Sequence, residues 1–110
     1  MKLARQYFLE KEKPEPDRAR FISRRQSYHG ITLGALSAGG HKFRRSKFEP
    51  LLSQNTSQVS PCYAYRGKRD GESDQDFVDK LLRELEDEFI RVGPDTVCGF
   101  IAEPVVGAVS

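Results

Sequence analysis

Apolar positions recur at helical spacing most clearly over residues 74–92 of the chain. Charged residues occupy the opposite side of this pattern, so one apolar stripe faces one way. Its members are Phe77, Val78, Leu81, Leu82, Leu85, Phe89 and Val92. Ser73 and Asp76 stand at the spacing of a capping box, and Gly93-Pro94 ends the pattern. The sequence therefore predicts an amphipathic helix over 74–92 with a solvated acidic face.

A second helical pattern opens the chain, over residues 1–11. Its apolar face consists of Leu3, Ala4, Tyr7 and Phe8. Pro14 and Pro16 follow and exclude a continuous helix. No Ser, Thr, Asp or Asn cap precedes the pattern, which predicts that this element begins upstream of Met1.

Two segments have the composition of strands. Residues 19–25 form the first, around Phe21 and Ile22, and the run 96–102 forms the second. The second is continuously apolar, which is typical of a strand buried on both faces of a parallel sheet. A short helix is predicted over 31–38, and residues 41–70 are predicted to be irregular. The chain after residue 102 is too short to cover both faces of that strand.

Composition narrows the class of protein without identifying it. A length of 110 residues corresponds to one modest domain, and 37% of the residues are hydrophobic. The net charge of +2 does not indicate a dedicated nucleic-acid binder. No apolar run is long enough to span a bilayer, and Cys62 and Cys98 do not form a disulfide framework. We therefore expect no membrane association and an intracellular protein, cytoplasmic or mitochondrial.

Candidate chemistry lies where the two predicted strands end. Tyr28-His29-Gly30 follows the first strand and Glu103 follows the second. Because ligands of open α/β sheets bind at the carboxyl ends of strands, we expect Tyr28 and Glu103 to converge on one edge of the sheet. The alternatives are a buried tyrosine with an ordinary turn glycine, and a solvated loop glutamate.

Other candidate sites are weaker. The spacing of His29, His41, Cys62 and Cys98 contains no short ligand pair, so no metal site is predicted. Two basic clusters could meet phosphates or nucleic acid, but solvated or subunit-facing surfaces are the favoured interpretation. The clusters are Arg18, Arg20, Arg24 and Arg25, and Lys42, Arg44, Arg45 and Lys47.

The ordered motifs resemble the class III (subgroup II) aminotransferases, which are pyridoxal-phosphate (PLP) enzymes. The resemblance is carried by residues 1–8, 21–37, 61–66 and 102–107. Its most specific part is Tyr-His-Gly-x-Thr-x-Gly-Ala, beginning at Tyr28, and Glu-Pro-Val-Val-Gly-Ala, beginning at Glu103, adds to it. The resemblance implies an α/β fold, part of the three-layer α/β/α large domain of the aspartate-aminotransferase type, with a mostly parallel sheet.

The resemblance also implies roles for single residues. Tyr28 would stack on the cofactor ring, with His29 beside it, and Gly30 would let the chain pass close to PLP. Glu103 would belong to the polar network that supports the residues beside the ring. Many relatives have a second glutamate at the position of Ala108, and its absence resembles the branch that uses ω-amino acids or amines with pyruvate rather than the ornithine or γ-aminobutyrate branch.

The same resemblance places other family residues outside residues 1–110. The phosphate-binding Gly-Ser turn would precede Met1, and the Schiff-base lysine and the aspartate of the ring nitrogen would follow Ser110. We therefore expect a partial PLP-binding large domain, truncated at both ends, with no catalytic residue and no transaminase activity by itself. The implied partners are an amino donor and a keto-acid acceptor, in a parent homodimer. A degenerate, non-enzymatic fragment or interaction module is the alternative.

Overall fold

A sheet of three parallel strands, in the order β2-β1-β3, forms the centre of the computed structural model. The strands are β1 (Arg20–Arg24), β2 (Thr56–Val59) and β3 (Val97–Ile101). The structure describes residues 1–62 and 69–105. The family-like positions at Tyr63, Tyr65, Val106, Gly107 and Ala108 therefore lie outside the described residues.

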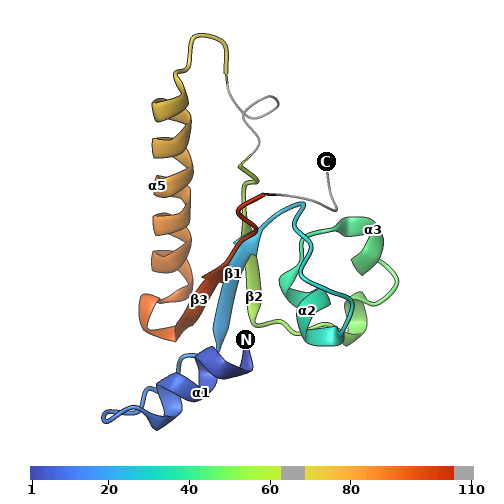
Figure 1. Cartoon of the computed structure of the whole chain (residues 1–110), viewed down its shortest axis with the longest axis vertical. Helices are drawn as coiled ribbons and strands as arrows, with labels where there is room; N and C mark the ends of the chain where they lie inside the picture. The colour runs from blue at the N-terminus through green and yellow to red at the C-terminus, as the bar shows by residue number, and fades with distance from the viewer. Residues whose placement is uncertain (63–68, 106–110) are drawn as a thin grey trace.

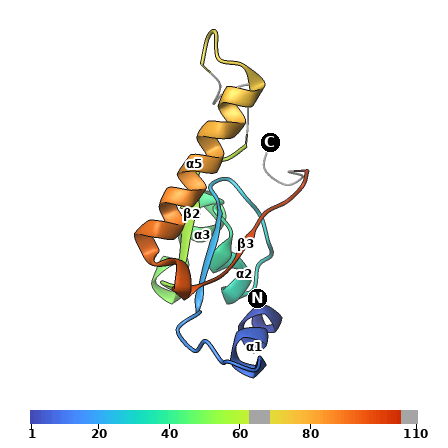
Figure 2. The same cartoon turned by 90° about the vertical axis from the view of Figure 1, so that its left-hand side faces the viewer.

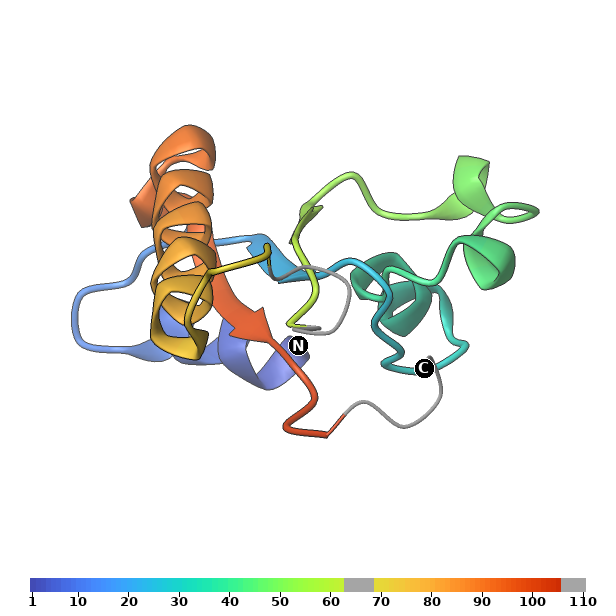
Figure 3. The ribbon, with the colours of Figure 1, turned by 90° about the horizontal axis from the view of Figure 1, so that it is seen from above.

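Helices cover both faces of this sheet. Figures 1 and 3 show α5 (Asp74–Val92) on one side, and α2 (Leu33–Ala38) with α3 (Lys42–Arg45) on the other. Alternate residues of β1 serve the two layers: Ile22 packs towards Leu85 and Phe89 of α5, and Ser23 donates a hydrogen bond to Ala38 O of α2 at 2.5 Å. The expectation of a layered, parallel α/β fold is confirmed.

Helix α5 begins with the predicted capping box. Ser73 Oγ accepts the backbone N–H of Asp76 at 3.0 Å, and Asp76 Oδ2 accepts the N–H of Ser73 at 3.5 Å. Of its apolar stripe, Phe77 is buried and Leu85, Phe89 and Val92 pack against the core. Val78 and Leu82 remain 41% and 58% exposed, because the small sheet covers only part of the helix.

Strand β3 differs from its prediction. Val97 is buried, but Phe100 is 39% exposed, so burial on both faces is wrong for this strand. The physical reason is that β3 lies at an edge of the described sheet, with a neighbour on one side only. The Arg24 guanidinium lies over the Phe100 ring at 5.9 Å and covers it in part.

The prediction of an irregular segment over 41–70 is also wrong in part. This segment contains α3, a 3-10 turn η1 (Glu49–Leu51) and strand β2. The sequence Thr-Ser-Gln-Val has one strongly apolar residue, so it carries little strand signal. The strand forms because its polar side chains have partners: Thr56 Oγ1 donates to Ser37 O at 2.9 Å, and Gln58 Nε2 donates to Gly39 O at 3.4 Å.

Helix α1 (Lys2–Glu10) lies beside the amino ends of the strands (Figures 1 and 2). Its predicted apolar face remains largely open, with Leu3 80% and Tyr7 61% exposed. Arg5 Nη1 donates to Arg18 O at 2.6 Å. Arg18 in turn donates to the carbonyl oxygen of Val97 at 2.9 Å, and Val97 directly follows the 3-10 turn η2 (Pro94–Thr96). Hydrogen bonds from two arginines thus connect α1, the entry to β1 and the start of β3.

We predict that Ser73→Ala lowers the free energy of unfolding by about 0.5–2 kcal/mol, because an N-terminal N–H of α5 loses its acceptor. Denaturant unfolding followed by helix circular dichroism measures the change. Ser46→Ala is the matched control, since Ser46 is exposed and makes only a 3.4 Å contact to Phe43 O. Equal effects of the two substitutions would show that the capping box contributes nothing.

Candidate functional site

The loops that follow β1 and β3 meet at the carboxyl edge of the sheet. The backbone N–H of Tyr28 donates to Glu103 Oε1 at 3.0 Å, and Arg24 Nη2 donates to Glu103 O at 3.4 Å. The predicted convergence of Tyr28 and Glu103 is therefore confirmed as geometry. We call Tyr28, His29, Gly30 and Glu103 the strand-end site.

Backbone hydrogen bonds hold the loop that leads to Tyr28. Gly40 N–H donates to Ser27 O at 3.0 Å, and Gln26 N–H donates to Gly40 O at 3.3 Å. A Cβ at Gly40 would lie 2.7 Å from Arg24 O, so only glycine permits this approach. The end of helix α2 thereby sets the path of the chain just before the strand-end site.

Gly30 combines two requirements for glycine. Its φ is +129°, a conformation that L side chains rarely adopt, and a Cβ there would lie 2.9 Å from the Cβ of Ala35. The turn at Gly30 therefore depends on the missing side chain.

His29 contributes an unusual polar atom. Its Nε2 is buried and has no hydrogen-bond partner among the residues that the structure describes. A buried nitrogen without a partner is costly, so a group that bonded to it would stabilise the site. His41 Nδ1, before α3, is in the same condition.

The ring of Tyr28 has a neighbour that the sequence does not predict. The guanidinium carbon of Arg44 lies over the ring, 4.7 Å from its centroid. Arg44 was assigned only to a basic cluster, and its distance of 16 residues from Tyr28 carries no signal of contact. Tyr28 itself is partly buried, so its ring is neither in the core nor free in solvent.

Several arginines of the two basic clusters make contacts within the fold. Arg18 bonds to Val97 O, and Arg45 Nη1 donates to Ser37 O at 2.7 Å and to Gly39 O at 2.5 Å. Arg25 Nη2 donates to Ser60 Oγ at 2.6 Å and lies 3.8 Å from Glu84. These contacts explain the arginines as intramolecular ties.

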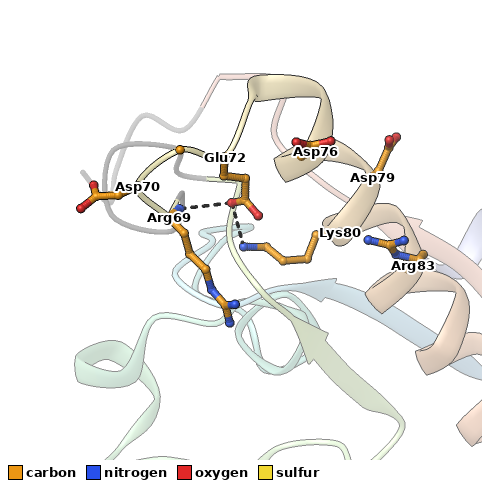
Figure 4. A pocket seen from close by; sticks show the side chains of 8 residues that line it. Arg69, Asp70, Glu72, Asp76, Asp79, Lys80 and Arg83 are labelled. Carbon is orange, nitrogen blue, oxygen red and sulfur yellow. Dashed lines mark hydrogen bonds and ion pairs between the residues drawn. The ribbon is translucent and has the colours of Figure 1, made fainter.

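A hollow of about 560 Å³ lies at the start of α5. Figure 4 shows Glu72 at its centre, where its carboxylate accepts the backbone N–H of Arg69 and the ammonium of Lys80, each at 3.2 Å. The hydrogen bond from the Arg69 backbone, and then that from Lys80, holds the pKa of Glu72 below 4.5. Lys80 already pairs with Glu72 at the centre of this hollow, and none of the motifs singled out in the sequence lies there, so it is a weaker candidate than the strand-end site.

Residues 1–62 and 69–105 contain no group of three or more His, Cys, Asp and Glu side chains that could hold a metal ion. Within the same ranges, none of the helices has the length and hydrophobicity needed to cross a membrane.

Comparison with known proteins identifies the family. The Aminotransferase class-III family model matches residues 1–109, so the chain belongs to this PLP-dependent family. An aminotransferase of Gibberella zeae is 51% identical over 109 residues, which are 98% of this chain and 21% of that protein. A mitochondrial gamma-aminobutyrate transaminase of rice is 38% identical over 93 residues, 84% of this chain and 18% of its own length.

Solved structures of the family share the fold. An (S)-enantioselective omega-transaminase from Thermomicrobium roseum superimposes with a TM-score of 0.87 and 40% identity, over 97% of this chain and 23% of its own. An amine transaminase from an uncultivated Pseudomonas species, solved in its PLP-bound form, gives 0.88 and 34% over 97% and 23%. The chain thus spans about a fifth of the length of the relatives it matches.

We predict that Gly30→Ala destabilises the chain by about 1–3 kcal/mol, because alanine must adopt a strained φ and displace Ala35. Thermal or denaturant unfolding measures the effect. Gly34→Ala is the matched control, since a Cβ there meets nothing within 4 Å and alanine favours the α2 helix by about 0.5–1 kcal/mol. If both variants are equally stable, the turn does not require glycine.

We predict that the Glu72 carboxyl titrates below pH 4.5 in the folded chain, and that Lys80→Ala moves its pKa part of the way back. A lowered pKa means that this interaction contributes stability above pH 4.5 and loses it as the pH falls through the folded value. Carbon-detected NMR of the side-chain carboxyl follows the titration. A pKa of Glu72 at or above 4.5 would contradict the geometry of Figure 4.

Proposed function

We propose that this chain forms the PLP side of a transaminase that moves an amino group from an amino donor to a keto acid. The observation that supports this most is the hydrogen bond from Tyr28 N–H to Glu103 Oε1. It joins the two motifs of the chain that most resemble class III aminotransferases, although 75 residues separate them in sequence. Family membership makes PLP the cofactor to test.

The residues of the strand-end site fit a flat, polar ring. Tyr28 offers an aromatic face for stacking, and the turn at Gly30, which a side chain would not allow, sets the path of the backbone beside it. His29 Nε2 is a buried polar atom without a hydrogen-bond partner among the described residues, and a polar group of the cofactor could form that hydrogen bond. The proposed role of Glu103 is to hold the Tyr28 backbone through the hydrogen bond from its N–H and not to contact the cofactor ring. When bound, PLP supplies the electron sink of transamination.

The proposed amino donor is an ω-amino acid or an amine, with pyruvate as the acceptor class. Ala108 in place of a second glutamate supports this choice. The similar protein named as an omega-transaminase points the same way. The rice relative named as a gamma-aminobutyrate transaminase represents the branch that Ala108 argues against. An intracellular location, cytoplasmic or mitochondrial, and a homodimeric parent enzyme complete the proposal; the rice relative is a mitochondrial protein.

We further propose that residues 1–110 do not transaminate by themselves. The family resemblance places the Schiff-base lysine and the aspartate of the ring nitrogen outside this segment. The chain also spans only 18–21% of the length of the two relatives described above. Tyr28, His29, Gly30 and Glu103 would then position a cofactor on which this segment alone performs no chemistry.

One observation favours the alternative of an interaction module. Large apolar side chains stay exposed on several elements, including Leu3 at 80%, Phe43 at 90% and Leu82 at 58%. An exposed apolar surface of this kind invites contact with another protein surface. Under this alternative the chain would fold or bind through those faces and show no affinity for a PLP-like ring.

We predict that pyridoxine 5′-phosphate, titrated into the isotope-labelled chain, shifts the amide resonances of Tyr28 and Gly30 saturably. This compound lacks the aldehyde of PLP, so it cannot form imines with surface lysines. Tyr28→Ala should weaken binding about two- to ten-fold, because a stacking face is lost. Tyr7→Ala is the control, since Tyr7 lies on α1, beside the opposite ends of the strands.

A second measurement tests inactivity. The chain incubated with PLP, γ-aminobutyrate and pyruvate should form no more alanine than the same mixture without the chain. Alanine formation above that level would overturn the proposed inactivity. Absence of any saturable shift at Tyr28 would overturn the proposed PLP site and favour the interaction module.

A further inference from the structure

Arg44 is the residue near the strand-end site that the proposed function leaves unused. We propose that Arg44 is a positioning residue for Tyr28: its guanidinium covers one face of the ring and fixes the orientation in which the other face meets the cofactor. This inference rests on the proposed function, and it adds a residue from α3 to the four residues of the site.

Helix α3 is anchored in a way that directs Arg44 to this place. The next residue, Arg45, donates through Nη1 to three carbonyls at the end of α2, including Ser37 O at 2.7 Å and Gly39 O at 2.5 Å. Arg45 Nε also bonds to Glu49 at 3.0 Å. These bonds fix α3 against α2, which itself is tied through Gly40 to the chain beside Tyr28.

Tyr28 is therefore held at two points. Its backbone N–H is bound by Glu103 at 3.0 Å, which sets where the residue lies. Its ring has the Arg44 guanidinium carbon 4.7 Å from the centroid, a distance at which a cation is attracted to the π face. The first contact leaves the ring free to rotate about its side-chain bonds, and the second favours one orientation of the ring, although Arg44 itself is exposed.

The charge of Arg44 is not committed to an anion. Arg18, Arg25 and Arg45 each pair with a glutamate, at Glu15, Glu84 and Glu49. In the part of the chain that the structure describes, no carboxylate forms an ion pair with Arg44, and its side chain is directed to a ring instead. A planar ring has two faces; the guanidinium lies over one of them, and the proposal assigns the other to the planar ligand.

The test compares four forms of the full 110-residue chain: wild type, Arg44→Ala, Arg44→Lys and Lys42→Ala. Lys42 is the matched control, because it belongs to the same short helix and its loss removes the same charge. Without any ligand, NOE contacts between the Arg44 side chain and the Tyr28 ring report the stacking. Titration with pyridoxine 5′-phosphate then measures the affinity at the Tyr28 amide.

We expect NOE contacts in the wild type and a change in the Tyr28 ring resonances in Arg44→Ala. Arg44→Ala should weaken binding about two- to five-fold, Arg44→Lys should recover part of the loss, and Lys42→Ala should weaken it less than Arg44→Ala does. The partial rescue by lysine separates a cation over the ring from a merely structural role.

The outcomes distinguish this inference from the proposed function. If the wild type binds and Arg44→Ala binds equally well or more tightly, the positioning role is wrong, and tighter binding shows that Arg44 competes for the ring. Equal losses in Arg44→Ala and Lys42→Ala would also overturn it, as would missing NOE contacts. If the NOE contacts are present but the wild type does not bind, the proposed PLP site itself is wrong.

Discussion

Parallel pairing of β1 with β3 is the constraint on which the rest of this structure depends. Two parallel neighbours end at the same edge of a sheet, so the residues that follow them are brought together however far apart they lie in sequence. The hydrogen bond between Tyr28 N–H and Glu103 is the direct result. An antiparallel arrangement would have placed these residues at opposite ends of the sheet and left no shared site.

Arginines provide much of the support around that edge. Arg18 and Arg45 each donate to backbone carbonyls where an element starts or ends, and Arg24 donates to the backbone of Glu103. Such carbonyls need donors because a helix end or strand entry has no regular partner for them. Basic side chains of this chain can therefore serve as hydrogen-bond donors to its own loops, and the charge pattern alone does not indicate an anionic ligand.

The exposed apolar faces have a simple physical account. A three-stranded sheet offers only enough area to bury one row of α5, and both β2 and β3 lie at its described edges. Leu82 and Ile90 on α5 and Leu3 on α1 consequently stay open to solvent. The relatives that share this fold are about five times longer, so their corresponding faces have more chain available to cover them.

The sequence by itself determined the elements with strong local signals: the capped helix α5, the strands around Phe21 and Val97, and the motifs that announced the family. Strand β2 could not be predicted from the sequence, because Thr56 and Gln58 form hydrogen bonds to carbonyls at the end of α2 and do not follow an apolar pattern. The same limit hid Arg44 over Tyr28. Contacts between distant segments leave no periodicity in the chain, so only the packing of α2 against the sheet and of α3 against α2 decided them.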